Sequence, residues 1–398
     1  MNKSTLRFLA SVRLSLTLVA ATVLLAGAQA SAQVICPVTE LTSGLLRPIG
    51  ITQSNQDNLL VSETGTTALH SGRISIVDLD GHRRTLLDRL PSGMSDVGDP
   101  SGPNGLFLRG RTLYVLIGIG DTLLPSQMPN PNPSSPIFSS VLAIHFSANV
   151  EKRTDGLTLT PAHQQALANG EKVRLGSGKD KITVELIVNF PDTAPAQPPQ
   201  PSGTFNGSNP FDLVAVGDQL YVTDGGMNLV WQVDNATGAF SVLATFPPIQ
   251  NPLFGTIGGP FVQAVPTGIA YSDGQLLVTL FRGFPFPPLT SVVEQIDPLT
   301  GDHAAFITGL KTAIDVLQIR EGGDTDYLVL QHTSGVGPPF VPPFLRPGLL
   351  LRFDAPGSSL TVIANCLSRP TSMTFDEKTG TLYVTELLSG RVVAIPVE

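Results

Sequence analysis

Short hydrophobic runs alternate with polar residues along most of the chain, and the runs come in pairs. One pair covers 220–234, LYVTDGGMNLVWQVD, where β-branched and aromatic residues flank a break at Asp224-Gly225-Gly226. Two such runs around turn-forming residues predict a strand, a turn and a second strand. The same arrangement recurs at 59–81, 276–301, 327–357 and 382–397. The sequence therefore predicts one hairpin that is repeated several times.

A short entry strand precedes each hairpin, and a further strand often follows it. The six entries are 47–51, 102–106, 209–213, 265–269, 312–316 and 369–373. Four antiparallel strands repeated radially predict an all-β fold, a six-bladed β-propeller.

The interval between the second and third entries is about twice the usual length, so it holds either two blades or one blade with an insertion. We favour one blade, with strands at 141–145 and 182–190 and an insertion at 147–181. A short helix is expected near 161–168, with Thr160 as N-cap, Pro161 as the first helical residue and Asn169-Gly170 as the stop.

The last hairpin ends at Val397, which leaves no residues for an outer strand in the sixth blade. Residues 34–45 resemble an outer strand, because LTSGLLRP matches ANCLSRP in position. We expect them to pair with 390–397 and close the ring. This alignment places Cys36 and Cys366 at opposite ends of outer strands, so it argues against a disulfide between them.

The first 32 residues have the pattern of a secretory signal peptide. Lys3, Arg7 and Arg13 precede or flank the apolar run 14–26, and Ala30-Ser31-Ala32 is a small-residue cleavage site. Cleavage is expected after Ala32, which leaves 33–398 as a single propeller domain in a secreted or periplasmic protein. The competing interpretation, a retained membrane anchor, is disfavoured because the run is short for a bilayer span.

Beyond residue 32 the chain holds 21 Lys and Arg against 32 Asp and Glu, a formal charge of −11. An acidic protein repels phosphate backbones, so we expect no nucleic-acid partner. No later apolar run is long enough to span a membrane, and we expect a monomer.

Long loops gather on one face of the predicted propeller, which we call the loop face. It carries the connections from second to third strands and from each outer strand to the next blade. These loops hold nine of the 19 Phe, among them Phe284 and Phe286. The rings either form an apolar cleft or lid over the channel, or pin the loops to the propeller.

Polar residues are expected around the central channel. They could bind polar groups or a cation, or they could cap the turns that follow the strands. The ends of second strands supply Glu63, Asp224, Gln331 and Glu386, the entries supply Asn104, Asp212 and Asp315, and His332 is followed by a loop with Arg346. The segment 78–81 resembles the start of a calcium loop but lacks its later ligands, so it is interpreted as a hairpin turn.

With these repeats, the chain resembles the exported ScyD/ScyE family of NHL-type propellers. The resemblance rests on RPIGI, LLVSETG and GRISIVDLDG in the first blade, GPNGLFLRGRTLYVLIGIGD in the second, and SNPFDLVAVGDQLYVTDGGMNLVWQVD in the third. It covers nearly the whole chain after the signal peptide. Named members of that family are associated with production of scytonemin, an aromatic indole-phenol pigment. The Pro- and Phe-rich loops depart from the family's pattern.

The leading hypothesis is a binding or scaffold protein that holds an apolar or aromatic small molecule, or a protein segment, on the loop face. It needs no cofactor. The alternative is a metal-dependent hydrolase or lyase that resembles the lactonase propellers, with Asp212, Asp315 and Asn104 around a divalent cation such as calcium. The sequence leaves open whether the protein is an enzyme.

Overall fold

Six antiparallel sheets follow one another along the chain, and each contains one of the predicted hairpins. The computed structural model describes residues 33–154, 156–196, 204–321, 324–334 and 346–397. The predicted signal peptide, 1–32, lies outside these residues. The first three blades are β2 (Pro48–Gln53), β3 (Asn58–Glu63), β4 (Gly72–Asp78), β5 (Arg83–Leu90); β8 (Pro103–Arg109), β9 (Thr112–Ile117), β10 (Ser140–Phe146), β13 (Asp180–Asn189); and β16 (Pro210–Val216), β17 (Gln219–Asp224), β18 (Leu229–Asp234), β19 (Phe240–Thr245).

The remaining three blades repeat the same order from the inner strand to the outer strand. They are β22 (Pro266–Ser272), β23 (Gln275–Leu280), β24 (Ser291–Ile296), β25 (His303–Leu310); β26 (Ala313–Glu321), β27 (Asp324–Gln331), β28 (Gly348–Phe353), β29 (Thr361–Leu367); and β30 (Pro370–Asp376), β31 (Thr381–Glu386), β32 (Arg391–Pro396), β1 (Thr39–Thr42).

Each inner strand contacts the inner strands of both neighbouring blades, and β2 contacts β30, so the ring is closed. This confirms the six-bladed propeller. The interval between the second and third entries forms a single blade, which excludes a seventh.

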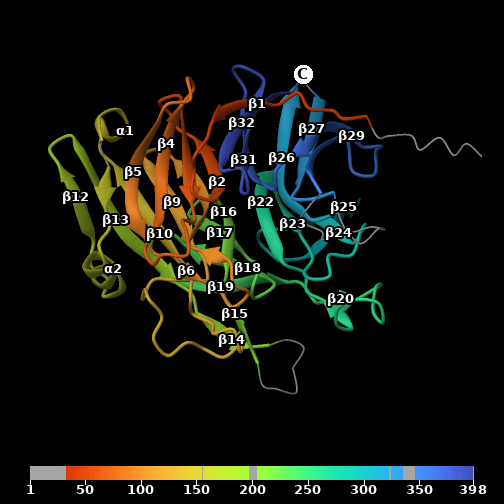
Figure 1. Cartoon of the computed structure of the whole chain (residues 1–398), viewed down its shortest axis with the longest axis horizontal. Helices are drawn as coiled ribbons and strands as arrows, with labels where there is room; N and C mark the ends of the chain where they lie inside the picture. Colours follow the sequence, from red (N-terminus) through yellow and green to blue (C-terminus); the bar gives the residue numbers. More distant parts are fainter. Residues whose placement is uncertain (1–32, 155, 197–203, 322–323, 335–345, 398) are drawn as a thin grey trace, which may run out of the picture. The chain divides into compact units, whose positions relative to one another are not determined.

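The N-terminal strand closes the ring, as the sequence predicts. Figure 1 shows β1, in red, beside β32 in dark blue. The two strands pair antiparallel, with Thr39 opposite Ala394 and Thr42 opposite Val392. The outer strand of the last blade therefore comes from the start of the domain, which couples both ends of the propeller.

Cys36 and Cys366 form a disulfide with their Cα atoms 5.7 Å apart, so the expectation of unpaired cysteines is wrong. That expectation assumed that the chain before β1 continues the line of the strand. Instead it crosses to β29 of the fifth blade. There Ile35 N donates to Asn365 Oδ1, and Asn365 N donates to Ile35 O, both at 2.9 Å. The disulfide is consistent with an extracellular or periplasmic protein.

Replacing both cysteines by serine is expected to lower the free energy of unfolding by about 3 kcal/mol, because the bridge restricts the unfolded chain over a long loop. The two cysteines are 330 positions apart. Urea denaturation of wild type and of Cys36→Ser/Cys366→Ser, both without reductant, measures this. An unchanged midpoint would show that the bridge adds nothing to stability.

The insertion in the second blade contains the expected helix, α2 (Pro161–Ala168), capped by Thr160 and ended by Asn169. It also contains α1 (Val150–Arg153) and two strands that were not expected. β11 (Leu157–Thr158) pairs parallel with β5, and β12 (Val173–Ser177) pairs with β13 as a fifth strand of the second blade. Among the described residues, no helix is long and apolar enough to cross a membrane.

The hydrophobic core lies between the blades. Trp231 of β18 stacks on Phe190, with ring centroids 5.2 Å apart, and meets the edge of Phe240 at 5.5 Å. It packs with Val188 from the second blade, so it lies between the second and third blades. Such stacking fixes the ring in one orientation.

Candidate functional site

The four polar residues at the ends of second strands hold the segment that enters their own blade. Each accepts a backbone hydrogen bond from that segment. The contacts are Leu46 N to Glu63 Oε2, 2.5 Å; Asn209 N to Asp224 Oδ1, 2.8 Å; Lys311 N to Gln331 Oε1, 2.5 Å; and Ser368 N to Glu386 Oε1, 2.7 Å. All four side chains are buried, and none lines the three pockets described below. Their geometry is that of turn caps.

Asp224 is the most strongly held of the four. Its Oδ2 accepts from Ser208 Oγ at 2.6 Å and from Trp231 Nε1 at 3.1 Å, while its Oδ1 also accepts from Met227 N at 3.0 Å. Burial nevertheless raises the pKa of this carboxyl above its ordinary value, because desolvation outweighs the hydrogen bonds. Asp224 therefore orients the tryptophan and the turn beside it.

The two aspartates of the inner strands lie at equivalent positions of the third and fifth blades. Asp212 Oδ2 accepts from Ile269 N of the fourth blade at 3.1 Å, and Asp315 Oδ2 accepts from Met373 N of the sixth at 2.8 Å. Each carboxylate thus ties its blade to the next. A glycine of the preceding blade lies beside each aspartate, Gly105 beside Asp212 and Gly268 beside Asp315. A Cβ on Gly105 would lie 2.7 Å from the Cα of Asp212, so there is no room for a side chain at that position.

Both aspartates line one pocket of about 390 Å³, which we call the aspartate pocket. Burial raises the pKa of Asp315 to about 7. Burial, reinforced by the negative charge of Asp315, raises the pKa of Asp212 well above its ordinary value. No Lys, Arg or His is among the described lining residues, which include Phe107, Tyr271 and Met373. The pair therefore lines a cavity whose described walls carry apolar groups and hydroxyls but no compensating cation.

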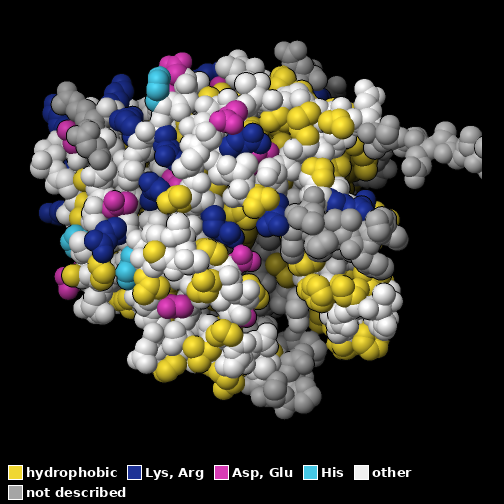
Figure 2. All heavy atoms as spheres, in the orientation of Figure 1, with side chains coloured by type: hydrophobic (Ala, Val, Ile, Leu, Met, Phe, Trp, Pro, Cys, Tyr) yellow, Lys and Arg dark blue, Asp and Glu magenta, His cyan; other side chains and the backbone are white. Residues whose placement is uncertain are grey.

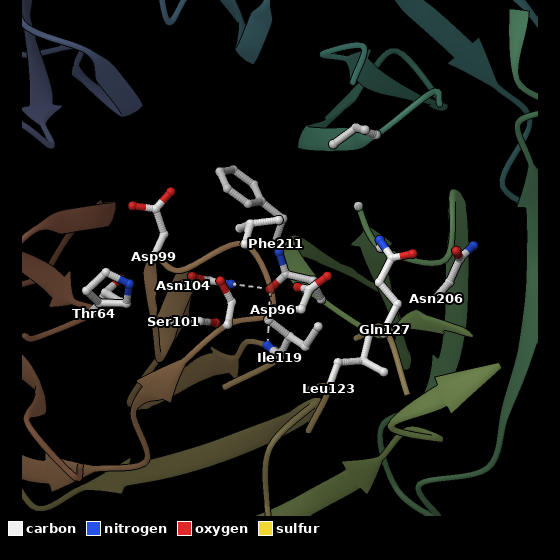
Figure 3. A pocket seen from close by; sticks show the side chains of 18 of the residues that line it. Thr64, Asp96, Asp99, Ser101, Asn104, Ile119, Leu123, Gln127, Asn206 and Phe211 are labelled. Atoms are coloured by element: carbon white, nitrogen blue, oxygen red, sulfur yellow. Dashed lines mark hydrogen bonds between the residues drawn. The ribbon is translucent and has the colours of Figure 1, made fainter. Parts of the chain in front are cut away.

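Asn104 lines a different pocket of about 380 Å³, the channel-mouth pocket (Figure 3). Its Nδ2 donates to Pro210 O at 2.7 Å and to Asn209 Oδ1 at 3.4 Å, the contact dashed in the figure. The cation site of the alternative hypothesis needs Asn104 together with Asp212 and Asp315. The structure brings the two aspartates together but places Asn104 in another cavity.

His332 is buried against the inner strand of the sixth blade. Its Nδ1 lies 3.0 Å from Pro370 O, and its ring meets the edge of Phe281 at 5.8 Å. Burial lowers the pKa of His332 to about 4, so the imidazole is neutral at physiological pH. In the described part of its loop, Arg346 O accepts from Thr333 Oγ1 at 3.2 Å.

Phe284 and Phe286 belong to an edge-to-face series on the loop face. Phe284 is 58% exposed and lies 6.0 Å from the half-buried Phe286, which in turn lies 5.8 Å from Phe281. Phe286 therefore pins its loop, and Phe284 leaves a ring in solvent. Figure 2 shows a further hydrophobic surface in the region where Figure 1 places β20 (Ile249–Gln250). Two more of the nine phenylalanines expected on the loop face, Phe340 and Phe344, lie outside the described residues.

The largest of the three pockets lies over the third blade, and we call it the proline pocket. Its volume is about 680 Å³. Two short ribbons contribute to its walls: β14 (Thr193–Pro195) with β15 (Phe205–Gly207), and the connection that contains β20 and β21 (Phe261–Val262). The lining residues described are Pro191, Ala194, Pro195, Asn206, Met227, Asn228, Leu229, Trp231, Thr245, Phe246, Pro247, Pro248 and Gln263.

Sequence reasoning located this face but missed these residues. The predicted apolar ligand contacts were Phe284 and Phe286, and neither lines this cavity, whereas four prolines, Met227 and the single tryptophan do. A signal was present: Pro191 and Pro247-Pro248 directly follow the outer strands of two successive blades. Proline restricts the backbone, so these segments are rigid. Because they follow the outer strands of the second and third blades, they can form cavity walls on both sides of the third blade.

Within the described residues, one group of three potential metal ligands is present: Asp78, Asp80 and His82. Asp78 Oδ1 accepts from His82 N at 2.8 Å and from Asp80 N at 3.1 Å. These are the hydrogen bonds of a β4–β5 turn, in agreement with the turn interpretation.

Solved propellers share this fold. The PQQ-bound aldose sugar dehydrogenase from Streptomyces coelicolor matches with a TM-score of 0.51 and 13% identity, over 92% of this chain and 98% of that chain. The Malassezia sympodialis allergen Mala s 1 matches with 0.50 and 11%, over 92% and 96%. A catalytically inactive virginiamycin B lyase from Staphylococcus aureus matches with 0.45 and 13%, over 91% and 98%.

The first two matches show a common fold, and at these identities they show nothing finer. No family model matches the chain, and no curated protein matches it. The resemblance to the ScyD/ScyE family therefore rests on the quoted motifs alone.

Proposed function

We propose that this protein binds a neutral aromatic or apolar small molecule in the proline pocket. The observation that carries the proposal is the pocket itself. Its volume of about 680 Å³ lies within the roughly 300–1,000 Å³ usual for small-molecule sites, and such sites are mostly apolar with a few fixed polar groups.

The described lining contains no charged side chain, so the pocket offers no partner for an ionic ligand group. Its polar side chains are the amides at positions 206, 228 and 263 and the hydroxyl of Thr245. Asn228 is held in place: its Nδ2 donates to Gln263 Oε1 at 3.1 Å, and its Oδ1 accepts from Val265 N at 2.9 Å. The amides can therefore orient a hydroxyl or carbonyl group on an otherwise apolar molecule.

The aromatic wall of the pocket is preformed. Trp231 is 8% exposed and is fixed by its hydrogen bond to Asp224 and by stacking on Phe190. A ligand ring that enters the pocket meets an indole that needs no reordering. Preorganisation of this kind lowers the entropic cost of binding.

The hydrolase or lyase alternative gains no support from this geometry. It requires Asn104 beside Asp212 and Asp315, and these residues line different cavities. Export to the periplasm or the medium remains part of the proposal, because the disulfide agrees with an oxidising compartment.

A charge placed in the proline pocket is expected to weaken binding of 1-naphthol at least tenfold. Met227→Lys would bring an ammonium group against the apolar lining, whereas the control Leu299→Lys adds the same charge at a residue 88% exposed on another hairpin. Calorimetric titration of the three proteins with 1-naphthol measures this. Equal affinity of Met227→Lys and wild type would refute the site, and absence of binding to wild type would refute an aromatic ligand of this size.

A further inference from the structure

The channel-mouth pocket differs in chemistry from the proline pocket. It is bordered by the segment between the first two blades, the β9–β10 loop of the second blade, β15 and the start of β16. Its side chains are amides, hydroxyls and carboxylates together with apolar surface from Ile119, Leu123 and Phe211 (Figure 3). Its volume of about 380 Å³ is close to the lower end of the range for small-molecule sites.

Several polar groups at this pocket are not used by the fold. Ser95 is only 7% exposed, and its Oγ is buried without a hydrogen-bond partner in the described structure. Neither Gln127 nor Asn206 makes a side-chain hydrogen bond to the described residues, although Gln127 O accepts from Phe205 N at 3.0 Å. Ser95 Oγ is closed off from the cavity, whereas the amides of Gln127 and Asn206 leave hydrogen-bonding capacity at the cavity wall for another molecule.

The arrangement of these groups is convergent. Figure 3 shows the side chains of Asn104, Asp96 and Gln127 around one space, although they come from an inner strand and two different loops. Amides both donate and accept, while a carboxylate only accepts. Together they match hydroxyl groups, each of which donates one hydrogen bond and accepts others.

The charges of the pocket exclude anionic ligands. No Lys, Arg or His is among its described lining residues, and Asp96 and Asp99 carry the only formal charges among them. Asp99 is paired with Arg47, whose Nη2 lies 3.3 Å from Asp99 Oδ1. A phosphate or carboxylate would meet repulsion from Asp96 and find no cation among the lining residues.

We propose that the channel-mouth pocket binds a neutral ring compound with several hydroxyl groups, of the monosaccharide type. The hydroxyls would be held by Gln127, Asn104 and Asp96, and the apolar face of the ring would lie against Phe211 or Ile119. This site adjoins the proline pocket at Asn206, which lines both, but it does not depend on the function proposed above.

The test is ligand-observed NMR titration of the full chain after its signal peptide with D-glucose, D-galactose and D-mannose, and with D-glucuronate and D-glucosamine as charged analogues. At least one neutral sugar is expected to bind saturably, and at least tenfold more tightly than glucuronate. Gln127→Leu and Asp96→Asn are each expected to weaken that binding about tenfold, because the first removes an amide and the second replaces a charged acceptor by a neutral amide.

Gln275→Leu is the matched control, because it makes the same change in the β22–β23 hairpin of the fourth blade. Retained melting temperatures would show that the pocket variants are folded, and retained 1-naphthol binding would show that the proline pocket is intact. The proposal is overturned if no neutral sugar binds, if the anionic analogue glucuronate binds more tightly than every neutral sugar, or if both pocket variants bind like Gln275→Leu.

Discussion

Removal of residues 33–45 is expected to abolish cooperative folding. The deletion takes away β1, so Val392 and Val393, which are fully buried, would lie on the unpaired outer strand of the sixth blade. It also removes Leu45, whose N donates to Gly390 O at 2.9 Å, and the disulfide partner of Cys366. An exposed apolar edge strand promotes association between chains.

The measurement is thermal unfolding followed by circular dichroism, with size-exclusion chromatography of the same sample. The truncated chain is expected to aggregate or to lack a cooperative transition. The double variant Cys36→Ser/Cys366→Ser separates the two losses, because it lacks the bridge but keeps β1. A soluble truncated protein with a cooperative melt would show that β1 is not needed to close the ring.

Replacing Asp315 by asparagine is expected to stabilise the protein relative to wild type as the pH rises. Burial raises the pKa of Asp315 from its ordinary 3.8 to about 7. A group whose pKa is higher in the folded state contributes stability that is fully present below pH 3.8 and is lost as the pH rises through about 7. A pKa difference of this size corresponds to roughly 4 kcal/mol between the two ends of that window.

Asparagine mimics the neutral form of the acid, so this pH dependence should vanish in Asp315→Asn. The quantity to compare is the free energy of unfolding of variant minus wild type, from urea denaturation at pH values between 4 and 8. It is expected to increase with pH, whereas the difference for the exposed control Asp302→Asn should stay flat. A flat difference for Asp315→Asn as well would show that Asp315 is ionised throughout the window.

Most of the fold could be predicted from the sequence because each blade repeats a local pattern. Turn residues between apolar runs located the hairpins, and the missing outer strand at Val397 indicated that the N-terminus closes the ring. Elements that depend on the path of the chain in space were missed. The disulfide follows from the crossing of Ile35 to β29, and no local pattern at Cys36 encodes that crossing. β12 was missed although Val173 and Leu175 alternate with exposed residues, because that segment was treated as part of an irregular insertion.

The candidate site was less predictable. The sequence indicated that the loop face is rich in proline and phenylalanine, but packing between loops decides which side chains reach a cavity. Phe286 packs against Phe281 and does not line the proline pocket. Trp231 packs between blades and nevertheless lines that pocket. The two kinds of aspartate also differ in position. Asp224 ends a second strand and caps a turn, whereas Asp315 lies near the start of an inner strand and lines the aspartate pocket.

The most direct test of the central claim, an aromatic ligand in the proline pocket, uses Trp231, the only tryptophan of the chain. Because this side chain lines the pocket, a bound 1-naphthol must come close to its indole. We predict that titration with 1-naphthol quenches tryptophan emission saturably, with one molecule bound per chain and with the affinity found by calorimetry, and that Met227→Lys abolishes the saturation. Calorimetric binding without any change in tryptophan emission would place the ligand elsewhere and contradict the proposal.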